Sequence, residues 1–244
     1  MIHREWSKWG ATVQGPTHQK AGLPNQDSWI VKQFVWGDIA VVADGLGSRP
    51  HSDVGSYAAC QAVVEASKVF IGNRIAESEL FLRLIHNIWL MKIAPLNPED
   101  CLTTCVLAIR MRNELFLAQI GDGMIVVSDA NRESSLVTND DKEDSFSNLT
   151  HSLGRKFILE QWQTFALEGC DPNAIILCTD GISDDLLPER RLAFAETVHL
   201  TYRDYSPMSR TKSIHKWLRE WPVPGHSDDK TIVCLYKNSE GHHS

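Results

Sequence analysis

Five aspartates are the residues of this sequence whose type and position could do chemistry: Asp27, Asp44, Asp122, Asp180 and Asp228. Each lies at the end of an apolar stretch and close to Gly, Asn or Ser. The pattern is clearest around Asp44 and Asp180, where an apolar run rich in β-branched residues leads into Asp-Gly. A buried strand that ends in this way presents one carboxylate and one unhindered backbone carbonyl at its exposed end. Both groups are suitable ligands for a metal ion.

Taken singly, each of these aspartates is better explained as a turn residue, because Asp commonly caps strands and forms Asx turns. Taken together they predict a shared site if the strand ends lie on one edge, since carboxylates so close cannot all stay ionised without cations. Oxygen ligands without a companion His or Cys favour Mg²⁺ or Mn²⁺ over zinc. Two such ions suit in-line attack on phosphorus, so phosphate-ester hydrolysis is the expected chemistry.

The elements that must position these aspartates are predicted from hydrophobic periodicity. Apolar or alternating runs predict strands at 9–15, 28–34, 39–43, 102–110, 114–120, 124–128, 174–180 and 231–236. Helical spacing predicts helices at 54–70, 77–93, 182–191 and 209–220. Residues 15–27 are rich in turn formers and are predicted to be a loop, and the turns at 112–113 and 121–123 favour antiparallel hairpins. Two adjacent helices after two or more strands indicate helices packed on a sheet, in one α+β domain spanning 1–244.

Composition and charge are those of an ordinary globular protein and argue against several classes. Of the 244 residues, 43% are apolar and 23% are charged, which suits a sizeable core. The net charge of −7 and the lack of a Lys or Arg block argue against nucleic-acid binding. Without a long apolar run or a signal-peptide core, we expect a cytoplasmic protein with no membrane contact. The six scattered cysteines are expected to be reduced and mostly in the core.

Five elements of the sequence occur in the order and rough spacing of a known family. They are Asn25–Ser28, Val42–Gly47, Thr103-Thr104 ahead of Ile120–Gly123, Cys178–Ile182 and Asp228–Thr231. The chain therefore resembles the PP2C (PPM) metal-dependent protein phosphatases over nearly its whole length, and it is most similar to their small bacterial branch. One Asp-Gly motif would carry little weight, whereas five ordered elements are specific.

The resemblance implies a four-layer α-β-β-α sandwich, in which two antiparallel sheets are flanked by helices. Two Mn²⁺ or Mg²⁺ ions, with a possible third, would lie at one end of the sandwich. Asp44 would bridge the two ions, and the Gly45 carbonyl would bind one of them. Asp180 and Asp228 would complete the ligands of the other ion.

The resemblance also implies roles for the remaining acids and an activity. Asp27 would act mainly through metal-bound water, Asp122 resembles the acid that holds a weaker third metal in bacterial members, and residues 129–155 resemble the family's flap. The implied reaction is hydrolysis of phosphoserine or phosphothreonine in a protein by attack of a metal-bridging hydroxide, opposing a Ser/Thr kinase in a bacterial cytoplasm. Two alternatives stay open: a catalytically weak PP2C-like binding or sensor module, and a phosphatase for small phosphoesters.

Three departures from the family pattern concern the substrate side of the site. Gln26 stands where many members have Glu, and Leu46 stands where eukaryotic members have a general-acid His. Gly22 lies near the expected place of the Arg that binds the substrate phosphate. The positive charge would then come from another basic residue, for which the candidates are His18, Lys20 and Arg49. Asp229 is expected to support Asp228 rather than to bind metal.

Overall fold

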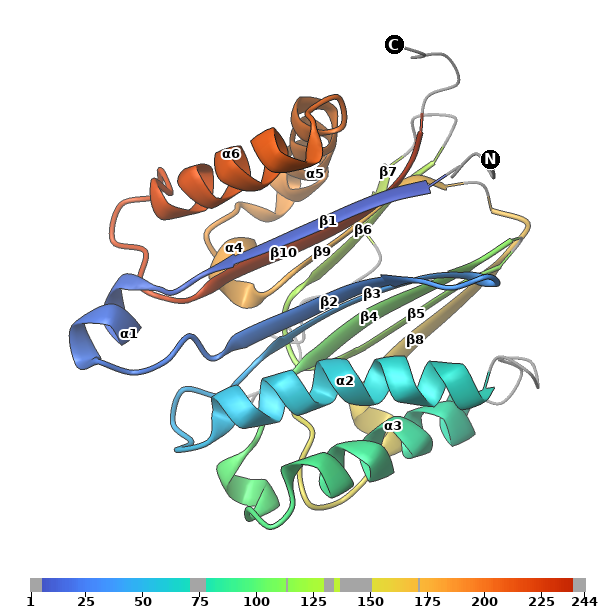
Figure 1. Ribbon diagram of the computed structural model, residues 1–244, viewed down its shortest axis with the longest axis vertical. Coiled ribbons are helices and arrows are strands. Elements are labelled where there is room, and N and C mark those ends of the chain that lie inside the picture. Colours follow the sequence, from blue (N-terminus) through green and yellow to red (C-terminus); the bar gives the residue numbers. More distant parts are fainter. Residues whose placement is uncertain are drawn as a thin grey trace.

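The computed structural model describes residues 6–70, 78–112, 114–129, 134–136, 151–170 and 172–238. Two antiparallel sheets pack face to face, and helices cover the outer face of each sheet (Figure 1). This is the predicted α+β fold with four α-β-β-α layers. The two sheets bring strand ends from distant parts of the chain to the same end of the sandwich.

The first sheet is built from both ends of the chain. It contains Trp6–Val13 (β1), Lys230–Lys237 (β10), Pro172–Cys178 (β9), Met124–Asp129 (β6) and Ser134–Leu136 (β7), in the spatial order β1-β10-β9-β6-β7. β1 pairs with β10 along its full length, from Trp6 opposite Lys237 to Val13 opposite Lys230. Because β9 pairs with β10 on the other side, the strand before Asp180 and the strand after Asp228 are neighbours.

The second sheet contains Asp27–Gln33 (β2), Gly37–Asp44 (β3), Cys105–Met111 (β4), Glu114–Ile120 (β5) and Trp162–Glu168 (β8), in that spatial order. β3 is buried on both faces. Ile39 and Val41 pack toward the helices, whereas Ala40 and Val42 pack between the sheets. Burial on both faces explains why this strand is a continuous apolar run rather than an alternating one.

The longer helices form the outer layers. Ser52–Phe70 (α2) and Ser78–Ile93 (α3) lie on the second sheet, and Arg191–Tyr202 (α5) and Pro207–Arg219 (α6) lie on the first (Figure 1). The short helices Pro16–Ala21 (α1) and Asp180–Ser183 (α4) lie toward one end of the sandwich, on the left in Figure 1. Short 3-10 helices span Pro98–Asp100, Leu159–Gln161 and Pro188–Arg190. No helix in the described ranges is both long and apolar enough to cross a membrane.

Two predictions about chain connections are wrong. The turn at 121–123 does not form a hairpin, because β5 belongs to the second sheet and β6 to the first. Both strands are largely buried on both faces, so their sequences carried no signal that distinguishes one sheet from the other. The helix predicted at 182–191 is instead the short α4, a turn and then α5, since Pro188 interrupts the helical pattern.

Several elements were not predicted, among them Ser134–Leu136 (β7), which lies in the segment expected to be the flap. The expected loop at 15–27 contains α1, which begins with Pro16 at a position that favours helix starts. β8 carries little apolar signal, because Trp162 is its only buried residue. α5 begins where the predicted helix was expected to end.

The predicted flap at about 129–155 lies mostly outside the described residues, which include 129, 134–136 and 151–155 of it. At the end of this segment the Leu153 amide donates to the Thr103 carbonyl at 2.8 Å. His86 Nε2 of α3 lies 2.8 Å from the Gly154 carbonyl oxygen. The chain therefore rejoins the second sheet and its helical layer beside the Thr103-Thr104 pair.

A substitution at Trp89 tests the packing of α3 on α2. Trp89 is fully buried, and its Nε1 donates to the Gly55 carbonyl at 3.0 Å. Trp89→Phe removes this donor and part of the ring, so the free energy of unfolding should fall by about 1–3 kcal/mol in urea denaturation followed by circular dichroism. Met91→Leu, at a position 77% exposed on the same helix, should change it by less than about 0.5 kcal/mol. Equal effects of the two substitutions would contradict this account.

Candidate metal centre

The predicted site residues gather at one end of the sandwich because each stands at a strand end. Asp27 begins β2 and Asp44 ends β3, and the two residues are directly opposite in the antiparallel register. Asp122 lies in the turn between β5 and β6. Asp180 follows β9 at the start of α4, and Asp228 precedes β10. Both sheets therefore contribute carboxylates to the same region.

A cavity of about 200 Å³ lies among these strand ends. Its walls come from both sheets, from α1 and from the loop after β3, and the lining residues are His18, Gln26, Asp44, Gly45, Leu46, Gly47, Thr104, Asp122, Asp180 and Asp228. Four of the five predicted aspartates and the predicted Gly45 thus line one cavity. Asp27 is not among the lining residues, because it is buried beside Asp44 in the β2–β3 ladder.

The Asp44-Gly45 turn is fixed by the strand beside it. The Asp44 amide donates to Thr104 Oγ1 at 2.9 Å. The Asp44 carbonyl accepts from the Thr103 hydroxyl and from the Thr104 amide, both at 2.8 Å. A Cβ on Gly45 would lie 2.5 Å from the Ser52 carbonyl oxygen, so only glycine fits here. Backbone bonds thus hold Asp44 in place while its side chain faces the cavity.

Asp27 is the most buried of the five aspartates, at 7% exposure. Its Oδ2 accepts from the Thr179 hydroxyl at 2.8 Å, and the same hydroxyl accepts from the Thr231 amide at 3.1 Å. One threonine therefore ties the start of β2 to the ends of β9 and β10. Asp27 Oδ1 is buried without a hydrogen-bond partner among the described residues. Such an oxygen is unfavourable unless a cation or a water satisfies it.

Asp122 depends on two glycines in the left-handed region of backbone conformation. Gly121 has a φ of 84° and Gly123 a φ of 126°, which other residues rarely adopt. A Cβ on Gly121 would also lie 2.6 Å from the His151 carbonyl oxygen. These glycines allow the chain to pass from one sheet to the other within a short turn, and the turn places Asp122 in the cavity wall.

Asp180 and Asp228 are brought together by contact between α4 and the turn before β10. A Cβ on Gly181 would collide with the Asp229 carbonyl, so glycine permits this close approach. Asp228 Oδ1 accepts from the Asp229 amide at 2.8 Å, and the Asp228 side chain is exposed. The buried Lys230 Nζ donates to the Asp228 carbonyl at 3.2 Å. This turn is therefore fixed on its inner side and open on the cavity side.

Burial and mutual repulsion raise the pKa values of three carboxyl groups. Burial, the largest cause, raises the pKa of Asp27 to about 7, with the charges of Asp229 and Asp180 adding to it. Burial and then the charge of Asp122 raise the pKa of Asp180 to about 7. The pKa of Asp44 lies well above its ordinary value because of burial and of the charges of Asp180 and Asp27. A bound cation would favour ionisation of all three groups.

These residues fit the Mn²⁺ or Mg²⁺ ions that the resemblance implies. Apart from the imidazole of His18, the groups that face the cavity offer oxygen ligands, which hard divalent cations prefer. Asp27 Oδ1 and Gln26 Oε1 are buried and have no hydrogen-bond partner within the described part of the chain. The site thus has acids that need a positive charge and oxygens that need a partner.

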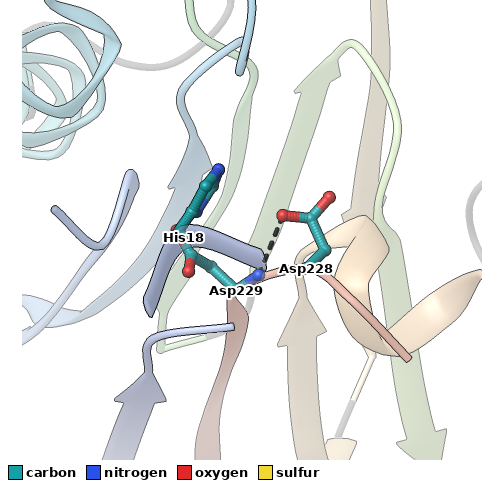
Figure 2. Close-up of side chains that lie close together, drawn as sticks. All are labelled: His18, Asp228 and Asp229. Atoms are coloured by element: carbon teal, nitrogen blue, oxygen red, sulfur yellow. Dashed lines mark hydrogen bonds and ion pairs between the residues drawn. The ribbon is translucent and has the colours of Figure 1, made fainter. Parts of the chain in front are cut away.

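Of the three basic residues considered for phosphate binding, only His18 lines the cavity. Lys20 is exposed on α1, and Arg49 lies in the loop after β3 with a buried Nε that has no partner among the described residues. Figure 2 shows His18 beside the turn that contains Asp228 and Asp229. The His18 Nδ1 lies 2.9 Å from Asp229 Oδ2.

Asp229 has more partners than the sequence indicated, where it was expected only to support Asp228. This side chain is 1% exposed and also accepts from the Gly15 and Gln26 amides, both at 2.6 Å. No local signal separates Asp229 from Asp228, since the two acids are adjacent in a turn and have the same side chain. The partners of Asp229 could not be predicted, since they lie at the other end of the chain.

Comparisons with known proteins agree with the fold. A model of the protein phosphatase 2C family matches residues 14–219. No curated protein matches the sequence.

Several solved structures share the fold. The catalytic domain of the serine/threonine protein phosphatase PstP in complex with two manganese ions matches with a TM-score of 0.62 at 18% identity, covering 96% of this chain and 99% of that chain. Stp1, a serine/threonine phosphatase from Staphylococcus aureus, matches with a TM-score of 0.65 at 17% identity, covering 96% and 95%. The S. agalactiae serine/threonine phosphatase matches with a TM-score of 0.66 at 14% identity, covering 95% and 99%. At these identities the likeness is one of fold.

The raised pKa values predict that the metal-free protein loses stability as the pH rises. Asp27 and Asp180 keep their protons up to about pH 7 when folded, whereas the unfolded chain releases them near about pH 4. Their contribution to folding is therefore present below about pH 4 and is lost as the pH rises through about 7. In EDTA, the melting temperature of the wild type relative to that of Asp27→Asn should fall by about 5 °C or more between pH 5 and pH 8.

Two comparisons sharpen this measurement. Asp27→Asn keeps an acceptor for the Thr179 hydroxyl. Asp204→Asn, at an exposed position between α5 and α6, is the control, and its melting temperature should equal that of the wild type at every pH. Added Mn²⁺ should reduce the difference in melting temperature that develops between the wild type and Asp27→Asn as the pH rises. Parallel pH profiles for the wild type and Asp27→Asn would show that the Asp27 carboxyl has an ordinary pKa.

Proposed function

The chain belongs to the protein phosphatase 2C family, and we propose that it hydrolyses phosphoserine and phosphothreonine in proteins at the cavity between the strand ends. The observation that carries this proposal is the convergence of four aspartates on one small cavity, with Asp44 and Asp180 strongly perturbed by burial and by neighbouring charge. Such an acid cluster is unfavourable by itself and is stabilised by divalent cations.

The proposal assigns the ligands of two Mn²⁺ or Mg²⁺ ions as the resemblance implies. Asp44 would be shared by the two ions, the Gly45 carbonyl would bind one of them, and Asp180 and Asp228 would bind the other. All four residues line the cavity, which supports the assignment. Ions of this kind lower the pKa of water and neutralise charge that develops on phosphoryl oxygens.

Asp27 and Asp122 have supporting roles in this proposal. Asp27 acts through water, in keeping with its position behind Asp44 and its unpartnered Oδ1. Asp122 holds a third ion, in keeping with its place in the cavity wall and its charge interaction with Asp180.

The attacking group in the proposed reaction is water. As the resemblance implies, this water would be activated by the bound ions and would attack the phosphorus directly, without a phospho-enzyme. Gln26 lines the cavity and its Oε1 has no partner there, so it is suited to accept a hydrogen bond from that water.

The proposed substrate is a phosphorylated protein, such as a Ser/Thr kinase or one of its targets. A cavity of about 200 Å³ is smaller than the ~300–1,000 Å³ typical of sites that enclose a whole ligand. It suits a phosphoryl group on a side chain better than an enclosed nucleotide. The cytoplasmic location and the lack of nucleic-acid and membrane partners stay predictions from composition.

Substitution of the proposed ligands tests the activity. Asp44→Asn and Asp180→Asn should each lower the Mn²⁺-dependent hydrolysis of p-nitrophenyl phosphate by about 100-fold or more, because each removes charge where an ion is needed. Asp204→Asn should leave the rate unchanged, and EDTA should abolish it. Turnover that survives both EDTA and the two ligand substitutions would exclude the proposed site. A wild-type protein that binds Mn²⁺ but hydrolyses nothing would favour a binding module.

A comparison of substrates tests the proposed class. A phosphothreonine peptide should be hydrolysed with a kcat/KM at least ~10-fold higher than that of a nucleotide or a sugar phosphate, since the small cavity contacts the phosphoryl group and leaves the rest of the substrate outside. Release of inorganic phosphate would be measured for all three under the same Mn²⁺ concentration. The reverse order would favour a phosphatase for small phosphoesters.

A further inference from the structure

His18 is held against the turn before β10 by hydrogen bonds at and beside the start of α1. The Thr17 amide donates to the Ser227 carbonyl at 3.1 Å, and the Gly15 amide donates to Asp229 Oδ1 at 2.6 Å. In Figure 2 the His18 ring and the Asp228 carboxylate project to the same side of this turn. The imidazole is therefore fixed in position even though α1 is a short surface helix.

Both oxygens of the Asp229 carboxylate hold these groups. Its two oxygens accept from the amides of Gly15 and Gln26 and lie within hydrogen-bond distance of His18 Nδ1. Donor atoms of His18, Asp228 and Asp229 lie within 4.8 Å of one another, but the three contacts of Asp229 leave it unsuited to bind a metal ion. Asp229 instead orients the imidazole, as carboxylates commonly do for functional histidines.

The other ring nitrogen, Nε2, is directed to the cavity. His18 lines the cavity, and its Nδ1 is engaged by Asp229. A Cβ on Gly47 would lie 4.0 Å from His18 Nε2 and 3.5 Å from Gln26 Oε1, so both atoms border the space left by this glycine. Gln26 is 5% exposed, and its Oε1 has no partner in the described ranges. An unfilled polar position thus exists next to His18 Nε2.

We propose that His18 binds the substrate phosphate through Nε2, that Asp229 positions the ring, and that this pair replaces the arginine missing near Gly22. The inference rests on the proposed function, because the ligand is the phosphoryl group of that reaction. A ring that donates from both nitrogens carries a positive charge, which Asp229 on one side and the phosphate on the other stabilise. Lys20 and Arg49 do not line the cavity and are not assigned this role.

Two substitutions separate the two ring nitrogens. His18→Asn places an amide near the position of Nδ1, where it can still donate to Asp229, but it does not reach the cavity. His18→Gln places an amide near the position of Nε2. His215→Asn on α6 is the matched control. Each Mn²⁺-loaded protein would be titrated calorimetrically with phenylphosphonate, a phosphomonoester analogue that cannot be hydrolysed, beside measurements of Mn²⁺ affinity, melting temperature, and KM and kcat for p-nitrophenyl phosphate.

We expect His18→Asn to weaken phenylphosphonate binding and to raise KM by ~10- to 100-fold, because it removes one charge-assisted hydrogen bond to the phosphoryl group. Mn²⁺ affinity and melting temperature should stay those of the wild type, and His18→Gln should recover part of the phosphonate affinity. Unchanged phosphonate affinity in His18→Asn would overturn the proposal, and so would a parallel loss of Mn²⁺ affinity. If no protein hydrolyses phosphoesters but phosphonate binding still depends on His18, the proposed function fails and this inference stands.

Discussion

Repulsion between carboxylates is the constraint on which this end of the molecule depends. Asp27 and Asp44 face each other across the β2–β3 ladder, so they cannot separate without breaking strand pairing. The hydroxyls of Thr103, Thr104 and Thr179 secure the backbone or the carboxylates at the points where this repulsion acts. The free energy gained by burying the two sheets therefore offsets the repulsion between these carboxylates, which would move apart in an unfolded chain. Divalent cations relieve the same repulsion, which links cofactor binding to the stability of the fold.

Two adjacent acids illustrate how position decides the task of a side chain. Asp228 and Asp229 have the same chemistry, but the turn before β10 gives the two side chains different surroundings. Asp228 is exposed toward the cavity, whereas Asp229 is buried against the N-terminal segment and accepts three hydrogen bonds. A charged group becomes a ligand or a structural anchor according to how many donors already surround it.

Much of the fold and the candidate site could be predicted, and the failures have a common cause. The strand at 39–43 and the helix at 54–70 have strong local signals, and the structure extends each only slightly, to Gly37–Asp44 and Ser52–Phe70. The aspartates at strand ends were likewise visible, because Asp-Gly after an apolar run is a local pattern. The passage between sheets at 121–123, the exposed β8 and the partners of Asp229 depend on contacts between distant segments, for which a single sequence holds no local signal.

The contacts of Asp229 also set the order in which the molecule can be completed. Asp229 accepts hydrogen bonds from the amide of Gly15, 214 positions earlier in the chain, and from the amide of Gln26, 203 positions earlier. In the same way, β1 pairs with the distant strand β10. During synthesis the N-terminal segment emerges long before the strand that it pairs with. A nascent chain that ends just before residue 228 already carries Asp27, Asp44, Asp122 and Asp180, but it has neither Asp228 nor the anchor for α1. Assembly of the cavity therefore needs the chain through β10, and a nascent chain that stops before residue 228 lacks a formed site.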